Sequence, residues 1–457
     1  MITVNCRYFQ IQERGSIMSQ RNDYNYSNFD NYNDGFNNRE YRRRSPQSRQ
    51  TVSNRPVYNV NRNNRRPKRR NKRRTRNRII IVCSFILIIV LLIVLFSIMF
   101  RGCSDDRLQA GSNISKETKS TAQTTASGEA SDGKQADESS GGLLSPSTFV
   151  TPEIKDDNSE GFNSFGIYVW NEAGFELFGS DEEKAKKYAE TINGFADKFS
   201  DNVKIYDMVV PNHTEMGLPQ RLKNNEAQSS SQADNIKSIY EKLSDKVTPV
   251  NAYNLIAEHN NEYIYFNSDH HWTGLGAYYA YSAFAQTTNQ KVLDLKSCEE
   301  KTIEGFTGSF TSYSDVIKSD TVHYWNLPYN VNMDIYRTAD TFDTYNSPYY
   351  EYAESGTATY GVFIIGDNQD TGLTVLRSES EDVSEGKKIA VIKESYGNAF
   401  VPYLTNNYQE VHTIDFRYFS QNIPEYCEAN GIDEVLFING VMSANTQIQL
   451  DSMSNLF

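Results

Sequence analysis

Cysteine, histidine and tryptophan are scarce in this chain: its 457 residues include 5 cysteines, 6 histidines and 3 tryptophans. Only Cys298 and Cys427 lie in the region that we expect to fold outside the membrane, and two cysteines do not make a disulfide framework. The two could pair, but lone cysteines are as often buried apolar residues, and we favour that interpretation. The sequence also lacks Cys-x-x-Cys and His-x-His spacings, which argues against a structural zinc site.

Charged residues are absent from the run Ile79 to Phe100, in which Ile, Leu, Val and Phe dominate. A helix of this length would measure about 33 Å, enough to cross a bilayer. A signal peptide would have a shorter apolar core and a small-residue cleavage site, and the run shows neither. We therefore predict a single transmembrane helix at 79–100.

The two sides of this run differ in charge. Residues 1–78 hold 20 Lys and Arg against 5 Asp and Glu, whereas residues 101–457 have a net charge of −27. Basic flanks stay in the cytoplasm, so we predict a protein of the cell membrane with a cytoplasmic N-terminus and an extracellular C-terminal domain. The basic cluster from Arg62 to Arg78 could instead bind nucleic acid, but it abuts the apolar run, and we expect no nucleic-acid partner.

Apolar periodicity is almost missing from residues 1–78, so we predict a disordered cytoplasmic tail, whose start could be Met1 or Met18. Residues 101–158 are rich in Ser, Thr and Gly and predict a flexible linker. The remaining residues, 159–457, alternate between strand-like and helix-like patterns, which predicts an α/β domain with a mainly parallel sheet flanked by helices and one antiparallel insertion. The predicted helices span 181–199, 233–243, 277–288 and the residues from 398 onward, the predicted strands span 203–210, 247–250, 263–266, 389–392, 411–414 and 434–438, and predicted hairpins join 165–170 to 175–178 and 361–365 to 373–376.

A candidate site begins with the run Asp269-His270-His271-Trp272-Thr273, between a predicted strand and a predicted helix. An Asp two residues before a His can accept from one ring nitrogen and leave the other free as a base. Ser395 lies on another predicted strand-to-helix turn, where a serine hydroxyl can point out of the sheet toward helical N–H groups. These positions predict a catalytic triad of Ser395, His271 and Asp269.

Two other interpretations of the histidines remain open. An isolated histidine more often packs at a strand end than acts in catalysis. Asp269, His270 and His271 could also bind a metal ion, with His213 as the one nearby addition, but adjacent residues rarely converge on one ion. We expect neither a metal nor a cofactor.

The Asp-His-His-Trp-Thr run, the Ser395-Tyr396-Gly397-Asn398 segment and the run Asp415 to Phe419 resemble the bacterial DHHW family. That family is related to alginate O-acetyltransferases of the AlgX and AlgJ type, whose fold is a rearranged SGNH hydrolase. The resemblance implies an SGNH-like domain in which the Asp-x-His pair precedes the serine, and it implies acetyl transfer. In one departure, Glu394 occupies the position where the family usually has Asp.

Further residues are candidates for supporting roles. His270 and Arg417 could contact the substrate, although Arg417 could equally hold a buried carboxylate such as Asp415. Trp272 and Tyr396 could stack on a sugar ring or pack in the core. Gly397 and Asn439 could help to bind an oxyanion, the latter because SGNH relatives use Asn and Gly there.

These patterns together predict a membrane-anchored O-acetyltransferase or acetylesterase acting on cell-surface polysaccharide or peptidoglycan. A membrane-embedded protein that passes acetyl groups across the bilayer is the expected partner. The alternative is a catalytically silent protein of the same fold that binds glycans or the cell wall.

Overall fold

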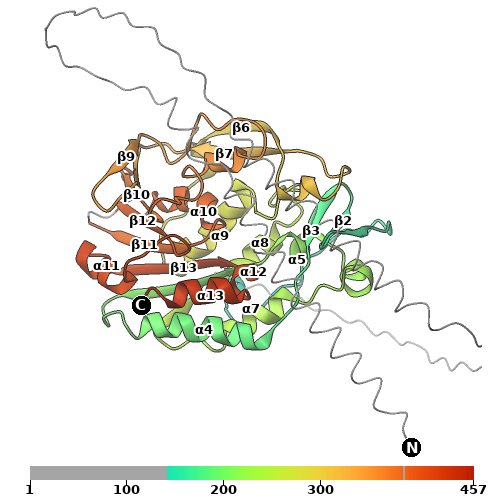
Figure 1. Cartoon of the computed structure of the whole chain (residues 1–457), viewed down its shortest axis with the longest axis horizontal. Helices are drawn as coiled ribbons and strands as arrows, with labels where there is room; N and C mark the ends of the chain where they lie inside the picture. The colour runs from blue at the N-terminus through green and yellow to red at the C-terminus, as the bar shows by residue number, and fades with distance from the viewer. Residues whose placement is uncertain (1–141, 384–385) are drawn as a thin grey trace, which may run out of the picture. The chain divides into compact units, whose positions relative to one another are not determined.

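Eight strands form the main sheet in the part of the chain that the computed structural model describes, residues 142–383 and 386–457 (Figure 1). Five neighbouring strands of this sheet run parallel, and three more continue it in antiparallel fashion at one edge. In spatial order the strands are β5 (Val247–Pro249), β4 (Lys204–Val210), β13 (Glu434–Gly440), β11 (Lys388–Lys393), β12 (Glu410–Asp415), β10 (Leu373–Ser378), β8 (Val331–Tyr336) and β9 (Phe342–Tyr345).

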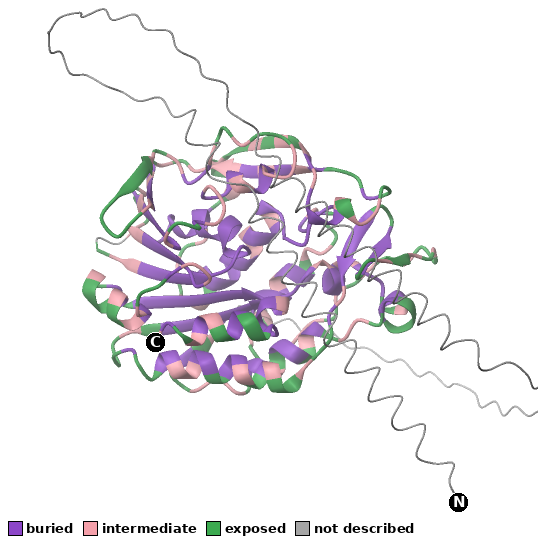
Figure 2. Cartoon of the chain, viewed as in Figure 1, coloured by how far each residue is buried: buried purple, intermediate pink, exposed green. Residues whose placement is uncertain are grey.

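The central strands are apolar because both of their faces are covered. Strands β11 and β13 are rich in Ile, Val and Leu, and almost every residue in them is buried (Figure 2). Branched side chains fit such a pleated, two-sided interior. Because β11, β12 and β13 run parallel, their carboxyl ends lie at the same edge of the sheet. Open α/β folds build their sites at this edge.

Helices cover both faces of the sheet. Helices α4, α7 and α13 pack together on one face, while α8, α9 and α10 pack together on the other. The longer helices are α4 (Glu182–Ala196), α7 (Gln232–Tyr240), α8 (Ala252–Glu258), α9 (Gly274–Thr287), α10 (Gly397–Leu404), α11 (Ile423–Asn430) and α13 (Gln447–Ser454). Shorter helical turns are α5 (His213–Gly217), α6 (Gln220–Leu222), η2 (Lys223–Ala227), η3 (Leu295–Ser297), η4 (Ser309–Ser312), η5 (Thr359–Val362) and α12 (Val441–Ala444).

Two small sheets lie beside the main one. The first contains β1 (Phe162–Ser164), β2 (Ile167–Trp170) and β3 (Ala173–Glu176). Strands β2 and β3 are joined by a two-residue turn in which Asn171 and Glu172 both have positive φ, as tight hairpins require. The second sheet pairs β6 (Glu299–Phe306) with β7 (Asp320–Asn326).

Most of the predicted elements are confirmed. Helices α4, α7, α9 and α10 and strands β4, β5, β11, β12 and β13 lie where the patterns placed them, within a few residues. The first predicted hairpin corresponds to the pair β2 and β3. The sheet is more mixed than predicted, because the aromatic-rich residues 305–350, for which no element was predicted, supply β8 and β9 to it.

Two predicted strands are wrong. Residues 263–266 make only a single bridge, between Tyr265 and Trp272, and they enter a loop that packs against the core. Residues 361–365 include the end of η5 and continue into a left-handed turn in which Ile364 and Ile365 have positive φ. Their apolar side chains are explained by burial in the core, and β10 pairs instead with β8 and β12.

The folded region begins before the predicted boundary at residue 159. The side-chain amides of Asn251 and Asn254 donate to the backbone carbonyls of Leu143, Ser145 and Thr148. Phe149 packs its ring against Tyr253 at a centroid distance of 5.2 Å. These contacts place the end of the predicted linker on the surface of the domain.

The predicted cytoplasmic tail, the predicted transmembrane helix at 79–100 and most of the predicted linker lie outside the described residues. Among residues 142–383 and 386–457, no helix is both long enough and apolar enough to cross a membrane. Cys298 and Cys427 are both free thiols, so the pairing that the sequence left open is not formed.

Candidate active site

The Asp-His-His-Trp-Thr run forms a closed loop in front of α9. The Phe266 N–H donates to the His271 carbonyl over 3.3 Å, and the Thr273 N–H donates to the Ile264 carbonyl over 2.9 Å. The Thr273 side chain then caps α9 by accepting from the Gly276 N–H. Both ends of the loop are thus fixed, which holds the side chains between them in place.

Trp272 joins this loop to the turn that carries Ser395. Its ring is fully buried, and its indole N–H donates to the Tyr396 carbonyl over 3.0 Å. The Tyr396 hydroxyl donates back to the His270 carbonyl over 2.5 Å. Trp272 and Tyr396 therefore act as packing and connecting residues, and neither ring is available as the sugar platform that the sequence offered as a possibility.

Three side chains from these two segments form a chain of hydrogen bonds. The His271 Nδ1–H donates to Asp269 Oδ1 over 2.6 Å, and the Ser395 hydroxyl donates to His271 Nε2 over 2.7 Å. Because Asp269 can only accept when ionised, it fixes the tautomer that leaves Nε2 as the acceptor. All three residues are buried, and Ser395 itself is 5% exposed.

Asp269 is held by the backbone of η4 as well as by His271. The Ser309 N–H donates to Asp269 Oδ2 over 2.8 Å, and Gly308 passes so close that a Cβ there would lie 2.3 Å from the Cβ of Asp269. Burial alone would raise the pKa of Asp269, but the two imidazoles and the hydrogen bonds outweigh it and keep this pKa well below its usual value. The carboxylate is therefore ionised at neutral pH.

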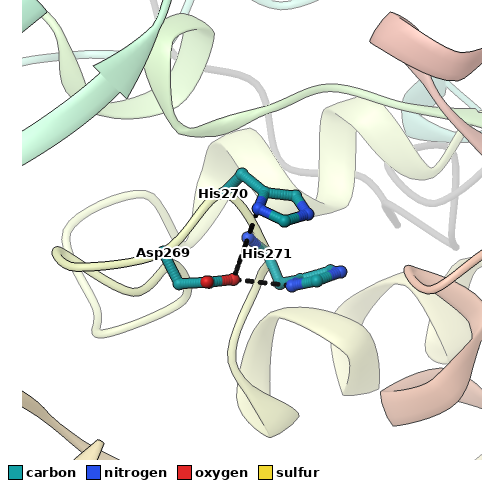
Figure 3. Close-up of side chains that lie close together, drawn as sticks. All are labelled: Asp269, His270 and His271. Carbon is teal, nitrogen blue, oxygen red and sulfur yellow. Dashed lines mark hydrogen bonds and ion pairs between the residues drawn. The ribbon is translucent and has the colours of Figure 1, made fainter. Parts of the chain in front are cut away.

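His270 lies beside His271 and points toward the same carboxylate (Figure 3). Its Nδ1 is 3.0 Å from the Ser309 hydroxyl and 3.7 Å from Asp269 Oδ1, and the two imidazole rings are 3.9 Å apart. Burial and the neighbouring His271 lower the pKa of His270 to about 3, so it is neutral at neutral pH. A neutral ring in this position supports the Asp269 contact without adding a competing positive charge.

Asp269, His270 and His271 are also the one group of potential metal ligands found among the described residues, with donor atoms within 4.8 Å of one another. His213 is not part of this group. A cation there would have to displace the hydrogen bond between Asp269 and His271 Nδ1. The arrangement fits a hydrogen-bonded acid–base pair better than a metal centre.

Glu394, directly before the serine, makes contacts that the sequence did not indicate. One oxygen of its buried carboxylate accepts from the Tyr396 N–H over 3.1 Å, and the other accepts from the Gly440 N–H over 2.8 Å. The first oxygen also lies 3.2 Å from the Ser395 hydroxyl. Glu394 thus ties the serine turn to the carboxyl end of β13.

Tyr360 covers the other side of His271. The two rings are stacked 4.1 Å apart, and the Tyr360 hydroxyl donates to the Ser395 carbonyl over 3.1 Å. This residue comes from η5, at the start of the segment that ends in the left-handed turn at Ile364 and Ile365. Strained backbone of this kind is often found next to functional sites.

A buried cluster of charges lies under the serine turn. Arg417 forms a two-point contact with Asp415 and a further 2.8 Å contact with Asp367. Lys393, which ends β11, lies 3.2 Å from Asp415 and 3.5 Å from Asp367. Burial would raise the pKa of Asp367, but these two cations hold it well below its usual value. Of the two predicted roles for Arg417, the contact with a buried carboxylate is the one observed.

Two predicted oxyanion residues lie elsewhere in the hydrogen-bond network. The Gly397 N–H donates to the Glu394 carbonyl over 3.0 Å, within the turn that leads into α10. The Asn439 side chain is buried and donates to the Tyr188 hydroxyl over 3.0 Å. Both groups thus have hydrogen-bond partners within the domain, and a role of either one in binding an oxyanion stays a prediction.

Ser309, Tyr360 and Asp367 contact the site, but the sequence analysis did not identify them. Ser309 and Tyr360 lie in a stretch without clear periodicity and carry no motif. Asp367 follows an apolar run and a glycine, Ile364-Ile365-Gly366, which is a pattern that can place a polar side chain at the end of a buried segment.

Two cavities of about 530 and 570 Å³ lie away from the triad, which lines neither of them.

The comparisons with known proteins agree with this architecture. The family model described as DHHW protein matches residues 135–414. The crystal structure of a DHHW family protein from Eubacterium siraeum is 30% identical, with a TM-score of 0.59, and the match covers 65% of this chain and 97% of that one.

A second solved structure shares the fold at lower identity. Bacillus cereus PatB1 with a sulfonyl adduct is 17% identical, with a TM-score of 0.50, and the match covers 64% of this chain and 99% of that one. Comparison with curated protein sequences gives no match.

Proposed function

The chain belongs to the DHHW protein family, and on that premise we propose that it is an acyl-ester enzyme of the cell envelope, which moves acetyl groups on a surface polysaccharide or peptidoglycan. The observation that carries the proposal is the hydrogen-bond chain from Asp269 through His271 to Ser395. A buried acid, an oriented imidazole and a hydroxyl within reach of its free nitrogen are the parts that nucleophilic acyl transfer needs.

In the proposed first step, His271 Nε2 takes the proton from Ser395 as the serine oxygen attacks the carbonyl carbon of an acetyl ester. Asp269 stabilises the imidazolium that forms. The ester C–O bond then breaks, and His271 gives the proton to the departing oxygen, which leaves acetyl-Ser395. In the second step His271 takes a proton from a sugar hydroxyl or from water, that oxygen attacks the acetyl group, and the serine hydroxyl is restored.

The acceptor decides whether the enzyme is a transferase or an esterase. Ser395 and His271 are buried, and Tyr360 covers one face of the imidazole. A site that excludes water disfavours hydrolysis of the acyl-enzyme. Transfer to a sugar hydroxyl is therefore the outcome that we propose.

We further propose that the enzyme is anchored in the cell membrane with its active site outside. The support is the uncharged run at residues 79–100 with its basic N-terminal flank. An acetyl group used outside the cell must first cross the bilayer, so a membrane-embedded acetyl-transfer protein is the partner that this topology requires.

One observation favours a second candidate function, a catalytically silent glycan-binding protein. The Glu394 carboxylate lies against the Ser395 hydroxyl and occupies the N–H groups of Tyr396 and Gly440. A negative charge there opposes an oxyanion at the same place. A binder would keep the fold and the glycan contacts without turnover.

A sulfonyl fluoride separates the two functions. A sulfonyl adduct exists for PatB1, which has the same fold, and such reagents modify activated serine hydroxyls. We expect mass spectrometry to find the label on Ser395, and we expect turnover of an acetyl-ester reporter to be lost in Ser395→Ala and His271→Ala. Ser282→Ala is the matched control, because Ser282 is also 5% exposed and lies on α9. Glycan binding without label or turnover would favour the silent protein, and loss of turnover on treatment with a chelator would favour a metal enzyme.

A further inference from the structure

Exposed aromatic side chains gather where the small sheet β1–β3 meets η4. Phe165 is 82% exposed and Phe162 is 48% exposed, and the Phe165 ring lies 6.5 Å from the half-buried Tyr313, at an angle of 51°. We call Phe162, Phe165 and Tyr313 the aromatic ledge. Large aromatic rings that are this exposed contribute little buried apolar area to the folded protein. A group of them on a surface therefore points to a ligand.

The backbone at Phe165 favours the same conclusion. This residue has φ of 48° at the tip of the β1–β2 hairpin. Residues with a side chain adopt this conformation at a cost, and a bulky ring is unusual there. Asparagine or glycine would fit the turn better, so the phenylalanine serves neither the turn nor the core.

A small apolar cluster supports the aromatic ledge at Tyr313. Ile167, Val169, Phe310 and Ile317 form this cluster, and Tyr313 packs against it. The Ser164 hydroxyl donates to the Tyr313 carbonyl over 2.5 Å, which fastens the hairpin to the segment after η4. Tyr313 and the hairpin backbone are therefore held in place before any ligand arrives, which lowers the entropic cost of binding.

The same elements connect the ledge to the candidate active site. Ser309, at the start of η4, contacts both Asp269 and His270, and Tyr313 follows η4 directly. The Phe310 N–H donates to the Ser268 carbonyl, and the Gly174 N–H donates to the Asn267 carbonyl, each over 2.8 Å. The small sheet, η4 and the loop that holds His271 are thus one hydrogen-bonded unit, which fixes the position of the ledge relative to the triad.

We propose that the aromatic ledge is a binding subsite for the sugar rings of a glycan polymer whose reacting unit lies at Ser395. The faces of sugar rings are apolar at their C–H groups and polar at their edges, so they match exposed aromatic faces surrounded by polar groups. Near the hairpin, Glu160 is paired with Arg221 and Glu172 with Lys318, so these pairs leave no excess positive charge to attract an anionic lipid surface. The inference rests on the proposed function and assigns it a polymeric substrate in place of a small ester.

The test measures binding by the full chain, purified in detergent, with Ser395→Ala so that the polymer is not altered. The probes are bacterial sacculi with their attached polysaccharide and sacculi from which it has been stripped, separated by centrifugation. Phe165→Asn removes the ring and suits the positive φ at this position. Phe342→Thr is the matched control, because Phe342 is 47% exposed and lies on β9 at the far edge of the main sheet.

We expect Phe165→Asn to weaken binding to at least one probe by about tenfold, the scale of one lost aromatic contact, and Phe342→Thr to leave binding unchanged. The difference between the two probes identifies the glycan. The proposal is overturned if Phe165→Asn binds as tightly as its parent, if the control weakens binding equally, or if the parent binds neither probe. Turnover of the ester reporter by the wild-type chain is measured separately, so a failure of the proposed function is recognised independently of the ledge.

Discussion

His271 Nε2 lies 2.7 Å from the Ser395 hydroxyl, although 124 positions separate the two residues in the sequence. The contact exists because two loops meet at the carboxyl edge of the sheet, one in front of α9 and one between β11 and α10. Each loop also bonds to the other through Trp272 and Tyr396. The meeting point is thus built into the fold and does not depend on a ligand.

Asp269→Asn is expected to lower the turnover of an acetyl-ester reporter by about 10⁴. An asparagine fills the same space but donates where the carboxylate accepts, so the imidazole would adopt the tautomer with its proton on Nε2. The Ser395 hydroxyl would then face a donor. Steady-state kinetics measure the effect, and a rate within tenfold of wild type would contradict the assigned roles.

Trp272→Phe tests whether the two loops must be tied together. The substitution keeps an aromatic ring in the core but removes the hydrogen bond to the Tyr396 carbonyl, which is expected to cost about 1 kcal/mol of stability. We also expect turnover of the reporter to fall by about tenfold or more, because a small displacement of the Ser395 nucleophile slows its attack on the ester. Trp170→Phe is the matched control, since Trp170 lies on β2 of the small sheet and its indole N–H donates to the Ser159 hydroxyl. Equal effects in the two variants would show that Trp272 only stabilises the fold.

Glu394 accepts hydrogen bonds from two backbone N–H groups. We therefore expect its replacement by Gln and by Asp to lower stability and turnover to different extents. We expect Glu394→Gln to lower stability by about 1–3 kcal/mol, because an amide cannot accept at both positions and leaves one buried N–H without a partner. Glu394→Asp keeps the charge and should retain more turnover than Glu394→Gln. Urea unfolding and reporter kinetics give both quantities, and higher turnover in Glu394→Gln would show that the charge opposes catalysis.

Local patterns predicted the central part of the fold well. Strands β11, β12 and β13 are short apolar runs with branched side chains, and helix α4 has the spacing of an amphipathic helix with Asp181 as its cap. In such segments burial and local preference agree, so the sequence alone identifies them. The Asp-His-His-Trp run and Ser395 could be singled out because only a few residue types can act as a base, its orienting acid or a nucleophile.

The errors have a common physical cause. Residues 263–266 and 361–365 are as apolar as strands, but their side chains fill the core from loops, where tertiary packing overrides the local preference for a strand. Ser309 and Tyr360 reach His270 and His271 through long-range contacts that leave no periodic signal. Asn439 lies near the carboxyl end of β13, within the strand, and its side chain donates to the Tyr188 hydroxyl, a direction that sequence position cannot specify.

Asp207 provides a test of pH dependence away from the candidate site. This residue lies on β4 in the interior, where Tyr188 donates to one of its oxygens over 2.7 Å. The other oxygen, and the carbonyl oxygen of the Asn439 side chain, have no hydrogen-bond partner among the described residues. Burial raises the pKa of Asp207 to about 7, so the folded protein holds a proton there that the unfolded chain releases near pH 4.

A pKa raised by folding stabilises the native state at low pH, and this contribution is lost as the pH rises from about 4 to about 7. We therefore expect the contribution of Asp207 to the unfolding free energy of residues 142–457 to fall over this range by an amount on the order of a few kcal/mol. Buried histidines such as His270, whose pKa is lowered, contribute with the opposite sign, and they do so equally in wild type and in an Asp207 variant. Asp207→Asn cannot ionise, so it should remove most of this fall and be more stable than wild type at pH 8. Urea unfolding at pH 4.5 and pH 8 measures both proteins. Tyr188→Phe removes the hydrogen bond to Asp207 and should make the fall steeper, and parallel curves for wild type and Asp207→Asn would show that Asp207 titrates normally.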